Sequence, residues 1–228
     1  MTSHPTRLGE ASWPEVAPGS LLAVPVGSCE QHGPHLPLNT DTRIAIALAE
    51  GLTTVHRDVV IAPALAYGAS GEHAAFAGTL SIGLDALAIV LTEIGRAADH
   101  FEGLVIVSGH GGNAEAVRQA VATLEGEGRR ALAWWPVIEG ADAHAGHAET
   151  SMMLAIDHEF VRLDRAEAGN VTPLRVLWPT LVRDGVAAVS PNGVLGDPTG
   201  ASALEGRRLL ARLASDLGAA VTTWRARW

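Results

Sequence analysis

The sequence predicts an α/β fold, in which a mostly parallel central sheet lies between two layers of helices in a three-layer α/β/α sandwich. Short apolar runs alternate along the chain with longer segments whose apolar residues recur every three or four positions. Strands that alternate with helices are joined by right-handed crossovers, so the strands run parallel and the helices cover both faces of the sheet.

Four short runs have the composition of strands, because they are rich in apolar residues and are bounded by Gly, Pro or charged residues. These runs are residues 20–26, 58–62, 103–107 and 130–135. In an open parallel sheet, ligands bind where the strands end. The segments that follow the strands are therefore the expected place of a functional site.

Four further segments are expected to be helices. In residues 84–101 the apolar positions form one stripe at three- and four-residue spacing, and residues 203–228 repeat that pattern. Residues 41–50 and 114–125 follow it less regularly. The stretch 169–200 contains several Gly and Pro residues and is expected to be a long loop of the kind that commonly carries function.

The composition indicates one domain over residues 1–228. The 228 residues, of which 47% are hydrophobic, can form a single sizeable core. No repeat, low-complexity tract or shift in composition marks a linker. The polar, Pro-bearing residues 1–18 are expected to be loosely ordered.

The charge and the cysteine content limit the partners and the compartment. The formal net charge is −9 and the sequence has no cluster of Lys and Arg, so neither a nucleic acid nor a membrane surface is an expected partner. One cysteine cannot form an intrachain disulfide. The sequence shows neither a secretory signal nor an apolar run of about 18 residues. These features predict a soluble, cytoplasmic protein.

Residues of the types that bind metal ions follow three of the predicted strands. They are Glu30, His32, His35 and Asp41 after the first strand, His110 after the third, and Asp142, His144, His147 and Glu149 after the fourth. Because parallel strands end at one edge of a sheet, these side chains are expected to converge there. So many polar and anionic groups would repel and desolvate one another without a cation. Mixed His and carboxylate ligands suit Zn, Fe or Mn, so we expect a pair of divalent ions bridged by one carboxylate.

Local spacing selects among these residues in the segment SCEQHGPHLPLNTD. Glu30 and His32 are two apart on an extended segment, so they face the same side, whereas Cys29 faces away from it. Asp41 is expected in the first turn of the following helix, where a carboxylate is favoured by the helix dipole and by free N–H groups.

Other interpretations of the same residues are open. A single histidine in a loop is more often a surface or hydrogen-bonded residue than a metal ligand. The segment SGHGGN is consistent with a plain turn between strand and helix, or with a phosphate-binding loop, although it lacks the G-x-G-x-x-G and G-K-S/T patterns. Cys29 with His32 or His35 as its base is a candidate nucleophile, for which no third orienting group is evident. The combination of motifs favours the metal centre.

The segments VPVGSCEQHGPHLPLNTDTRIA, VSGHGGN and DAHAGHAETSMML resemble the creatininase (creatinine amidohydrolase) family, over about residues 20–215. The resemblance implies a creatininase-like fold, two divalent metal ions per subunit and hydrolysis of an amide bond. It implies that the metal ligands are Glu30, His32, Asp41 as the bridge, His110 and a final glutamate.

One departure from the family pattern affects the ligand set. Creatininase proper has Tyr and Glu directly after the histidine of its third-strand loop, where this sequence has Gly111 and Gly112. That glutamate is a metal ligand in creatinine-cleaving members, so Gly112 removes the ligand and the creatinine pocket with it. We assign the role of the final ligand to Glu149. The alternative is that Glu149 acts as a base and does not bind a metal ion.

The resemblance also implies an acid/base role for His144, whose ordinary pKa of about 6.5 permits both protonation states near neutral pH. His144 and Glu149 are therefore the expected catalytic residues. The residues expected to contact the substrate are His35, Tyr67, Glu72, His73, Trp135 and His147.

Within the family, the segments AYGASGEHAAFAGTLSIG, HAGHAETS, GVAAVS and GVLGDPT most resemble peptidases that release Val-Tyr from the C-terminus of a modified, ribosomally made precursor peptide. A modified precursor peptide is thus the expected substrate, and Arg175 or Arg183 is a candidate to bind its terminal carboxylate. Because related proteins assemble into rings or multimers, a homo-oligomer is expected. The alternatives are a small-molecule amidohydrolase acting on a cyclic amide or formamide, and a metal-binding scaffold without turnover.

Overall fold

The computed structural model describes residues 6–228 and confirms the predicted parallel sheet. Within these residues, four strands lie in the order β2-β1-β3-β4, and every neighbouring pair is parallel. The strands are β1 (Leu21–Val26), β2 (Val59–Ile61), β3 (Gly103–Ser108) and β4 (Ala131–Trp134). Each boundary lies within one residue of the run predicted from the sequence.

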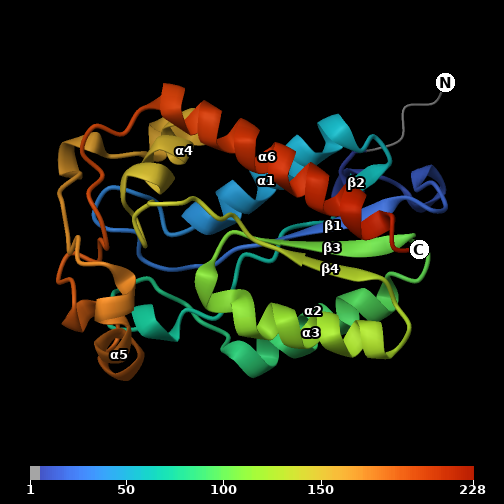
Figure 1. The fold of residues 1–228 in the computed structure, drawn as a ribbon, viewed down its shortest axis with the longest axis horizontal. Helices are drawn as coiled ribbons and strands as arrows, with labels where there is room; N and C mark the ends of the chain where they lie inside the picture. Colours follow the sequence, from blue (N-terminus) through green and yellow to red (C-terminus); the bar gives the residue numbers. More distant parts are fainter. Residues whose placement is uncertain (1–5) are drawn as a thin grey trace.

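Helices cover both faces of the sheet, as Figure 1 shows. One layer consists of α1 (Thr40–Val55), α4 (His147–Asp157) and α6 (Ala203–Arg225), and the other of α2 (Leu84–Ala97) and α3 (Ala114–Gly126). The expected α/β/α sandwich is therefore confirmed. Short 3-10 turns complete the described chain: Leu8–Glu10, Trp13–Glu15, η3 (Gly71–His73), η4 (Gly111–Asn113), His158–Phe160, Leu163–Arg165 and η7 (Val186–Ala188).

Side-chain alternation along the strands divides the core into two halves. In β1, Leu21 and Ala23 pack in the core beneath α1, α4 and α6, whereas Leu22 and Val24 pack in the core beneath α2 and α3. Both sets are almost fully buried. A central strand of this kind needs a continuous apolar run rather than an alternating one, which is what the sequence provides.

The segment 169–200, predicted as a loop, contains the helix α5 (Leu174–Asp184). This helix has apolar residues at three- and four-residue spacing, but it carries Pro179 in its interior and buries only Leu181. Proline inside the segment and Gly and Pro residues around it are typical of a loop, which is why the sequence analysis did not predict the helix. It packs beside η7 in a small separate cluster with Leu195. Figure 1 shows α5 apart from the two helical layers.

Two further expectations concern the order of residues 1–18 and the presence of membrane-spanning helices. Of the residues expected to be loosely ordered, 1–5 lie outside the described part of the chain, and two of the 3-10 turns fall in residues 6–18. No helix within residues 6–228 combines the length and the apolarity that are needed to cross a bilayer.

Asn113 fixes the positions of three loops at the carboxyl edge of the sheet. Its side chain is fully buried, Oδ1 accepts a hydrogen bond from the Ala69 N–H at 2.9 Å, and Nδ2 donates to the Gly27 carbonyl at 2.9 Å. Gly27 follows β1, Ala69 lies in the segment after β2, and Asn113 itself lies after β3. One amide thus joins three of the loops in which predicted site residues occur.

Replacing Asn113 with Ala is expected to destabilise the fold by about 2–6 kcal/mol, because two buried backbone groups lose a partner and each costs about 1–3 kcal/mol when left unpaired. Denaturant titration of the free energy of unfolding measures the effect. The control is Gln119→Ala, at an exposed position of α3, which should change stability by less than about 0.5 kcal/mol. Equal effects of the two substitutions would contradict the role given to Asn113.

Candidate metal centre and active site

The five predicted metal ligands meet at the carboxyl edge of the sheet. Glu30 and His32 lie after β1, Asp41 in the first turn of α1, His110 after β3, and Glu149 in the first turn of α4. The ends of β1 and β3 are adjacent, since Val26 pairs with Ser108. All five are buried except Glu149, whose side chain is 23% exposed.

Asp41 directs its two carboxylate oxygens at two different imidazoles. Oδ1 lies 3.0 Å from His32 Nε2, and Oδ2 lies 3.2 Å from His110 Nδ1. The Ser28 hydroxyl donates to Oδ2 at 2.7 Å and fixes the orientation of the carboxylate. Burial raises the pKa of Asp41, but His32 and His110 outweigh burial and hold the pKa well below its ordinary value. This arrangement suits a carboxylate that bridges two ions.

Glu30 is a buried carboxylate without a hydrogen-bond donor. Within the described residues, neither of its oxygens accepts a hydrogen bond, although His110 Nε2 lies 3.1 Å from Oε2 and His73 Nε2 lies 3.5 Å from Oε1. Burial raises the pKa of Glu30 to about 8. An ionised carboxylate in such a place is costly unless a cation lies beside it. The surroundings of Glu30 therefore fit a metal ion.

The two ligand imidazoles are oriented by their neighbours. His32 Nδ1 donates to the Glu30 carbonyl at 3.2 Å, which leaves Nε2 directed at Asp41 and 3.9 Å from Glu149 Oε2. A metal-binding histidine commonly donates its other ring N–H in this way. Burial lowers the pKa of both rings, but the carboxylates around them raise it to about 10 for His32 and about 9 for His110. Metal ions that bind here should therefore displace protons.

Three sets of side chains place one donor atom each within 4.8 Å of one another. The sets are Glu30, Asp41 and His110; His32, His144 and Glu149; and Glu30, His73 and His144. Mixed imidazole and carboxylate donors fit Zn, Mn or Fe ions. The first two sets contain all five predicted ligands, and Asp41 lies between them because it contacts both His32 and His110.

A sharp turn before α4 brings the side chains of His144 and Glu149 close together. Between them, Ala145 has a positive φ of 53°, which is uncommon for a residue other than Gly. The Ala145 N–H donates to Glu149 Oε2 at 2.6 Å. Burial raises the pKa of Glu149, and the charge of His32 opposes that rise. Backbone strain at this turn, which costs about 1–3 kcal/mol, is thus located between the two predicted catalytic residues.

Gln31 connects His73 and His144, and the sequence analysis missed this role. Its Nε2 lies 2.9 Å from His73 Nδ1 and donates to the Gly193 carbonyl at 3.0 Å, while its Oε1 accepts from the Gly33 N–H. The partners lie up to 162 residues away in the sequence, so no local spacing could indicate them. Gln31 therefore joins loops that the sequence does not connect.

The tautomers of both rings follow from these contacts. His144 Nε2 lies 2.8 Å from the Gln31 carbonyl oxygen and 3.0 Å from the Gln31 side-chain Nε2, whose two N–H groups have His73 Nδ1 and the Gly193 carbonyl as partners. Because the carbonyl can only accept, His144 Nε2 carries the proton, and Nδ1 faces Glu30 Oε1 at 3.8 Å. His73 Nδ1 accepts from the Gln31 amide, so its Nε2 carries the proton. Burial lowers the pKa of His144 well below its ordinary value and that of His73 to about 3. Both rings are neutral at neutral pH.

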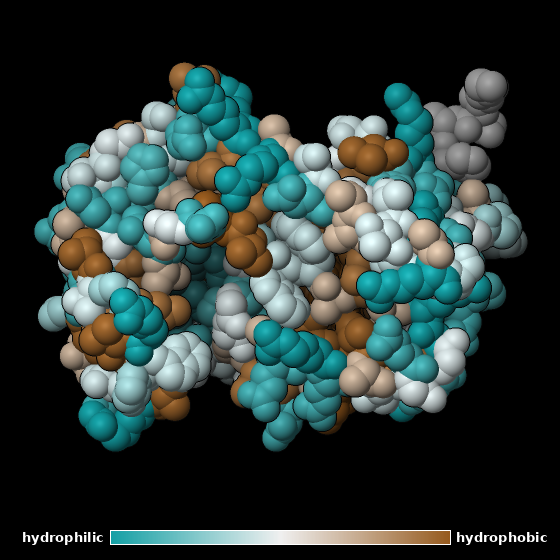
Figure 2. All heavy atoms as spheres, in the orientation of Figure 1, coloured by the Kyte–Doolittle hydropathy of each residue, from teal (hydrophilic) through white to brown (hydrophobic). Residues whose placement is uncertain are grey.

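A cavity of about 1000 Å³ opens over these groups. Figure 2 shows the surface hollowed between the part of the molecule that carries α5 and the remainder. Of the residues expected to contact the substrate, Glu72 and His73 line the cavity, together with Asp41, His110, His144 and Glu149.

The other four residues expected to contact the substrate are not among the described lining residues: His35, Tyr67, Trp135 and His147. His35 is buried, with its Nε2 2.9 Å from Thr150 Oγ1, and burial lowers its pKa to about 4. Tyr67 is half exposed, and Trp135 lies against Arg118. The His147 backbone N–H donates to Asp142. Contacts of these four with a substrate stay predictions.

The Cys29 thiol donates to the Gly78 carbonyl at 3.6 Å and belongs to none of the three donor sets.

Gly112 has no room for a side chain. A Cβ atom there would lie 2.3 Å from His110 Nε2, 2.5 Å from the Ala69 carbonyl oxygen and 2.7 Å from Glu72 Oε1. The glutamate that the family pattern places at this position therefore cannot be accommodated beside His110 and Glu72. Glu72 Oε1 itself lies 3.7 Å from His110 Nε2.

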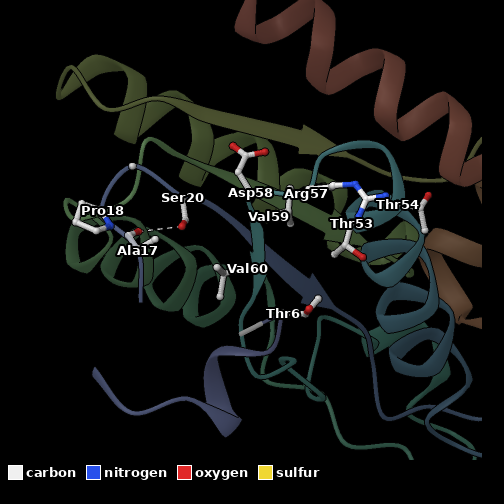
Figure 3. A pocket seen from close by; sticks show the side chains of 11 residues that line it. Thr6, Ala17, Pro18, Ser20, Thr53, Thr54, Arg57, Asp58, Val59 and Val60 are labelled. Carbon is white, nitrogen blue, oxygen red and sulfur yellow. Dashed lines mark hydrogen bonds between the residues drawn. The ribbon is translucent and has the colours of Figure 1, made fainter. Parts of the chain in front are cut away.

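A second cavity, of about 640 Å³, lies at the opposite end of the sheet, where β1 and β2 begin. Figure 3 shows Arg57 and Asp58 on its rim with Thr53 and Thr54 nearby. Asp58 is paired with Arg225. This cavity contains none of the three donor sets, so the metal centre and the large cavity at the carboxyl edge form the candidate site.

Comparison with known proteins gives one family and close relatives. The model of the family described as Creatininase: Creatinine amidohydrolase matches residues 9–221. The chain is 51% identical to the mycofactocin precursor peptide peptidase of Mycobacterium ulcerans (strain Agy99), over 94% of this chain and 87% of that protein.

Two solved structures are similar over nearly the whole chain. A crystal structure of creatinine amidohydrolase has a TM-score of 0.80 at 24% identity, covering 97% of this chain and 98% of that one. A Zn-Zn form of a creatininase variant has a TM-score of 0.79 at 25% identity, covering 95% and 97%. The first shows the fold, and the second has a metal pair of the kind that the donor sets suit.

Divalent ions are expected to stabilise this protein. If free Zn²⁺ or Mn²⁺ is present at about 100 times its Kd, the stabilisation is about 2.7 kcal/mol, which raises Tm by roughly 5–10 °C for a chain of this size. Calorimetry before and after chelation measures the shift, and elemental analysis should find about two ions per chain.

Glu30→Gln should remove most of this metal-dependent rise in Tm, because a neutral amide replaces the unpartnered carboxylate. Glu115→Gln is the matched control, since Glu115 lines the same cavity but belongs to none of the donor sets. A rise in Tm that is equal in both variants would contradict the assignment of Glu30 as a ligand.

Proposed function

Because the chain belongs to the creatininase family, we propose that it is a metal-dependent peptidase that removes the C-terminal Val-Tyr dipeptide from the modified mycofactocin precursor peptide. The observation that carries this proposal is its similarity, over almost the whole chain, to relatives that bear that peptidase name. The large cavity beside the donor sets supports it, since a peptide needs more room than a compact cyclic amide.

The ion-binding residues are proposed to be Glu30, His32, Asp41, His110 and Glu149, with Asp41 shared by two ions of Zn, Fe or Mn. When bound, divalent ions supply the positive charge that polarises a scissile carbonyl and acidifies water. The protein residues fix the positions of these charges, because hydrogen bonds from Ser28 and to the Glu30 carbonyl hold Asp41 and His32 in place.

His144 is proposed to move the proton during cleavage. Its Nε2–H is held by the Gln31 carbonyl, so the unprotonated Nδ1 is free to accept a proton from the attacking water. The same nitrogen then donates that proton to the leaving amine of the dipeptide as the C–N bond breaks. The lowered pKa of His144 favours release of the proton in this second step. Glu149 contributes either as a ligand or as a base beside His144.

The remaining expectations stay predictions. We also propose a homo-oligomer, a cytoplasmic location and a single domain over residues 1–228. Contacts of the peptide with His35, Tyr67, Trp135 and His147 also stay predictions. Creatinine-type substrates are disfavoured, because Gly112 leaves no place for the glutamate of creatinine-cleaving members.

The proposal is tested by incubating the metal-loaded protein with the modified precursor peptide and measuring its mass. We expect loss of the mass of Val-Tyr from wild-type reactions. His144→Gln should lower kcat by about 10²- to 10⁴-fold, which is the usual contribution of a general acid–base residue, while it retains the metal ions.

His100→Ala is the control, since His100 is exposed beyond the end of α2 and should not affect turnover. Turnover of cyclic amides or formamides with an intact precursor would instead support a small-molecule amidohydrolase. Binding of the precursor without cleavage, unchanged in His144→Gln, would support a scaffold protein.

A further inference from the structure

The large cavity is strongly acidic and contains little free positive charge. Five carboxylate side chains line it: Asp41, Glu72, Glu115, Glu149 and Asp184. Only two arginines, Arg118 and Arg183, are among the described lining residues, and Arg175 is not. The Arg183 guanidinium is engaged with Asp184, with contacts of 2.7–3.1 Å.

Arg118 differs from Arg183 because no carboxylate in residues 6–228 forms an ion pair with it. Its guanidinium carbon instead lies 4.9 Å from the centre of the Trp135 ring, directly beyond the end of β4. Stacking of this kind orients a guanidinium while leaving its N–H groups available. Arg118 is therefore an oriented cation in the cavity wall without an acidic partner.

Arg118 lies in the second turn of α3, eight residues after the predicted ligand His110, and both residues line the large cavity. A substrate that is bound at the donor sets therefore lies in the same cavity as the Arg118 side chain.

One face of α5 supplies an apolar wall to the same cavity. Leu174, Trp178 and Val182 follow each other at four-residue intervals, all three line the cavity, and they are 38%, 55% and 64% exposed. Exposed apolar side chains at helical spacing that face a cavity are suited to contact apolar groups of a ligand.

We propose that Arg118 binds the α-carboxylate of the last substrate residue, and that Leu174, Trp178 and Val182 contact the side chains of the departing dipeptide. The proposal rests on the proposed function and extends it, because it names the group that makes the enzyme select the free C-terminus of a peptide. A planar guanidinium matches a carboxylate in a two-pronged hydrogen bond.

The test measures binding of the Val-Tyr dipeptide and of its C-terminal amide to the Zn-loaded protein by calorimetry. The wild type should bind the free acid about 10- to 100-fold more tightly than the amide, as expected for a charge-assisted hydrogen bond. Arg118→Gln should bind both equally. Arg118→Lys should keep part of the preference, since it retains the charge without the planar fork.

Two further variants distinguish recognition of the carboxylate by Arg118 from effects that any substitution could have on binding. Arg208→Gln, at an exposed position of α6, should keep the full preference for the acid. Trp178→Ala should weaken acid and amide alike, because the apolar contacts do not involve the carboxylate. Thermal unfolding checks that Arg118→Gln remains folded, which its exposed side chain leads us to expect.

A preference for the acid that persists in Arg118→Gln overturns the proposal, as does a wild type that binds acid and amide equally or binds neither. Mass spectrometry of the wild-type reaction with the modified precursor separates the two proposals. Cleavage without an Arg118-dependent preference refutes only the subsite, and an Arg118-dependent preference without cleavage refutes only the peptidase function.

Discussion

The burial of two carboxylates, those of Glu30 and Asp41, against the imidazoles of His32 and His110 is the constraint on which the site depends. Glu30 and Asp41 are removed from water, and no donor within the described chain satisfies Glu30. Such groups stay together only if the backbone prevents them from moving apart and a positive charge balances them. The parallel sheet meets the first condition by ending two adjacent strands at one edge, and Asn113 ties the loops that follow them. Protons on His32 and His110, or metal ions in their place, meet the second.

The main parts of the fold, and the shared face of Glu30 and His32, could be predicted from the sequence because their causes are local, whereas the proposed set of five ligands rests on the resemblance to the creatininase family. A buried parallel strand needs an unbroken apolar run, and Glu30 and His32 share a face because they are two residues apart. The role of Gln31 could not be predicted, because its partners come from loops far away in the sequence. The helix α5 was missed for a different reason, because Pro179 and the Gly and Pro residues around the helix favoured a loop although its apolar residues recur at helical spacing.

The cavity lining combines groups of different chemistry, which bears on the direction in which a peptide lies. The donor sets and His144 provide the polar groups beside which a scissile bond must be placed. The apolar face of α5 and the Arg118 guanidinium, which has no ion-pair partner in the described residues, line the same cavity. A C-terminal segment with apolar side chains and a single negative charge is complementary to these groups. An N-terminal segment, which ends in a cation, would meet Arg118 with like charge.

Gly111 and Gly112 affect both which residues are available to bind metal ions and how much space the cavity offers a substrate. At Gly112 a Cβ atom would collide with His110 and with Glu72, so a side chain at this position and the observed placement of Glu72 exclude each other. At Gly111 a Cβ atom would meet no atom within 4 Å, so this residue leaves open space at the cavity wall. A chain that loses a ligand at position 112 must obtain one from elsewhere, and Glu149 lies 3.9 Å from His32. The two glycines also place no side chain in the cavity between His110 and α3, the helix that carries Arg118, and the side chain of the third intervening residue, Asn113, is buried and hydrogen-bonded to the backbone of Ala69 and Gly27.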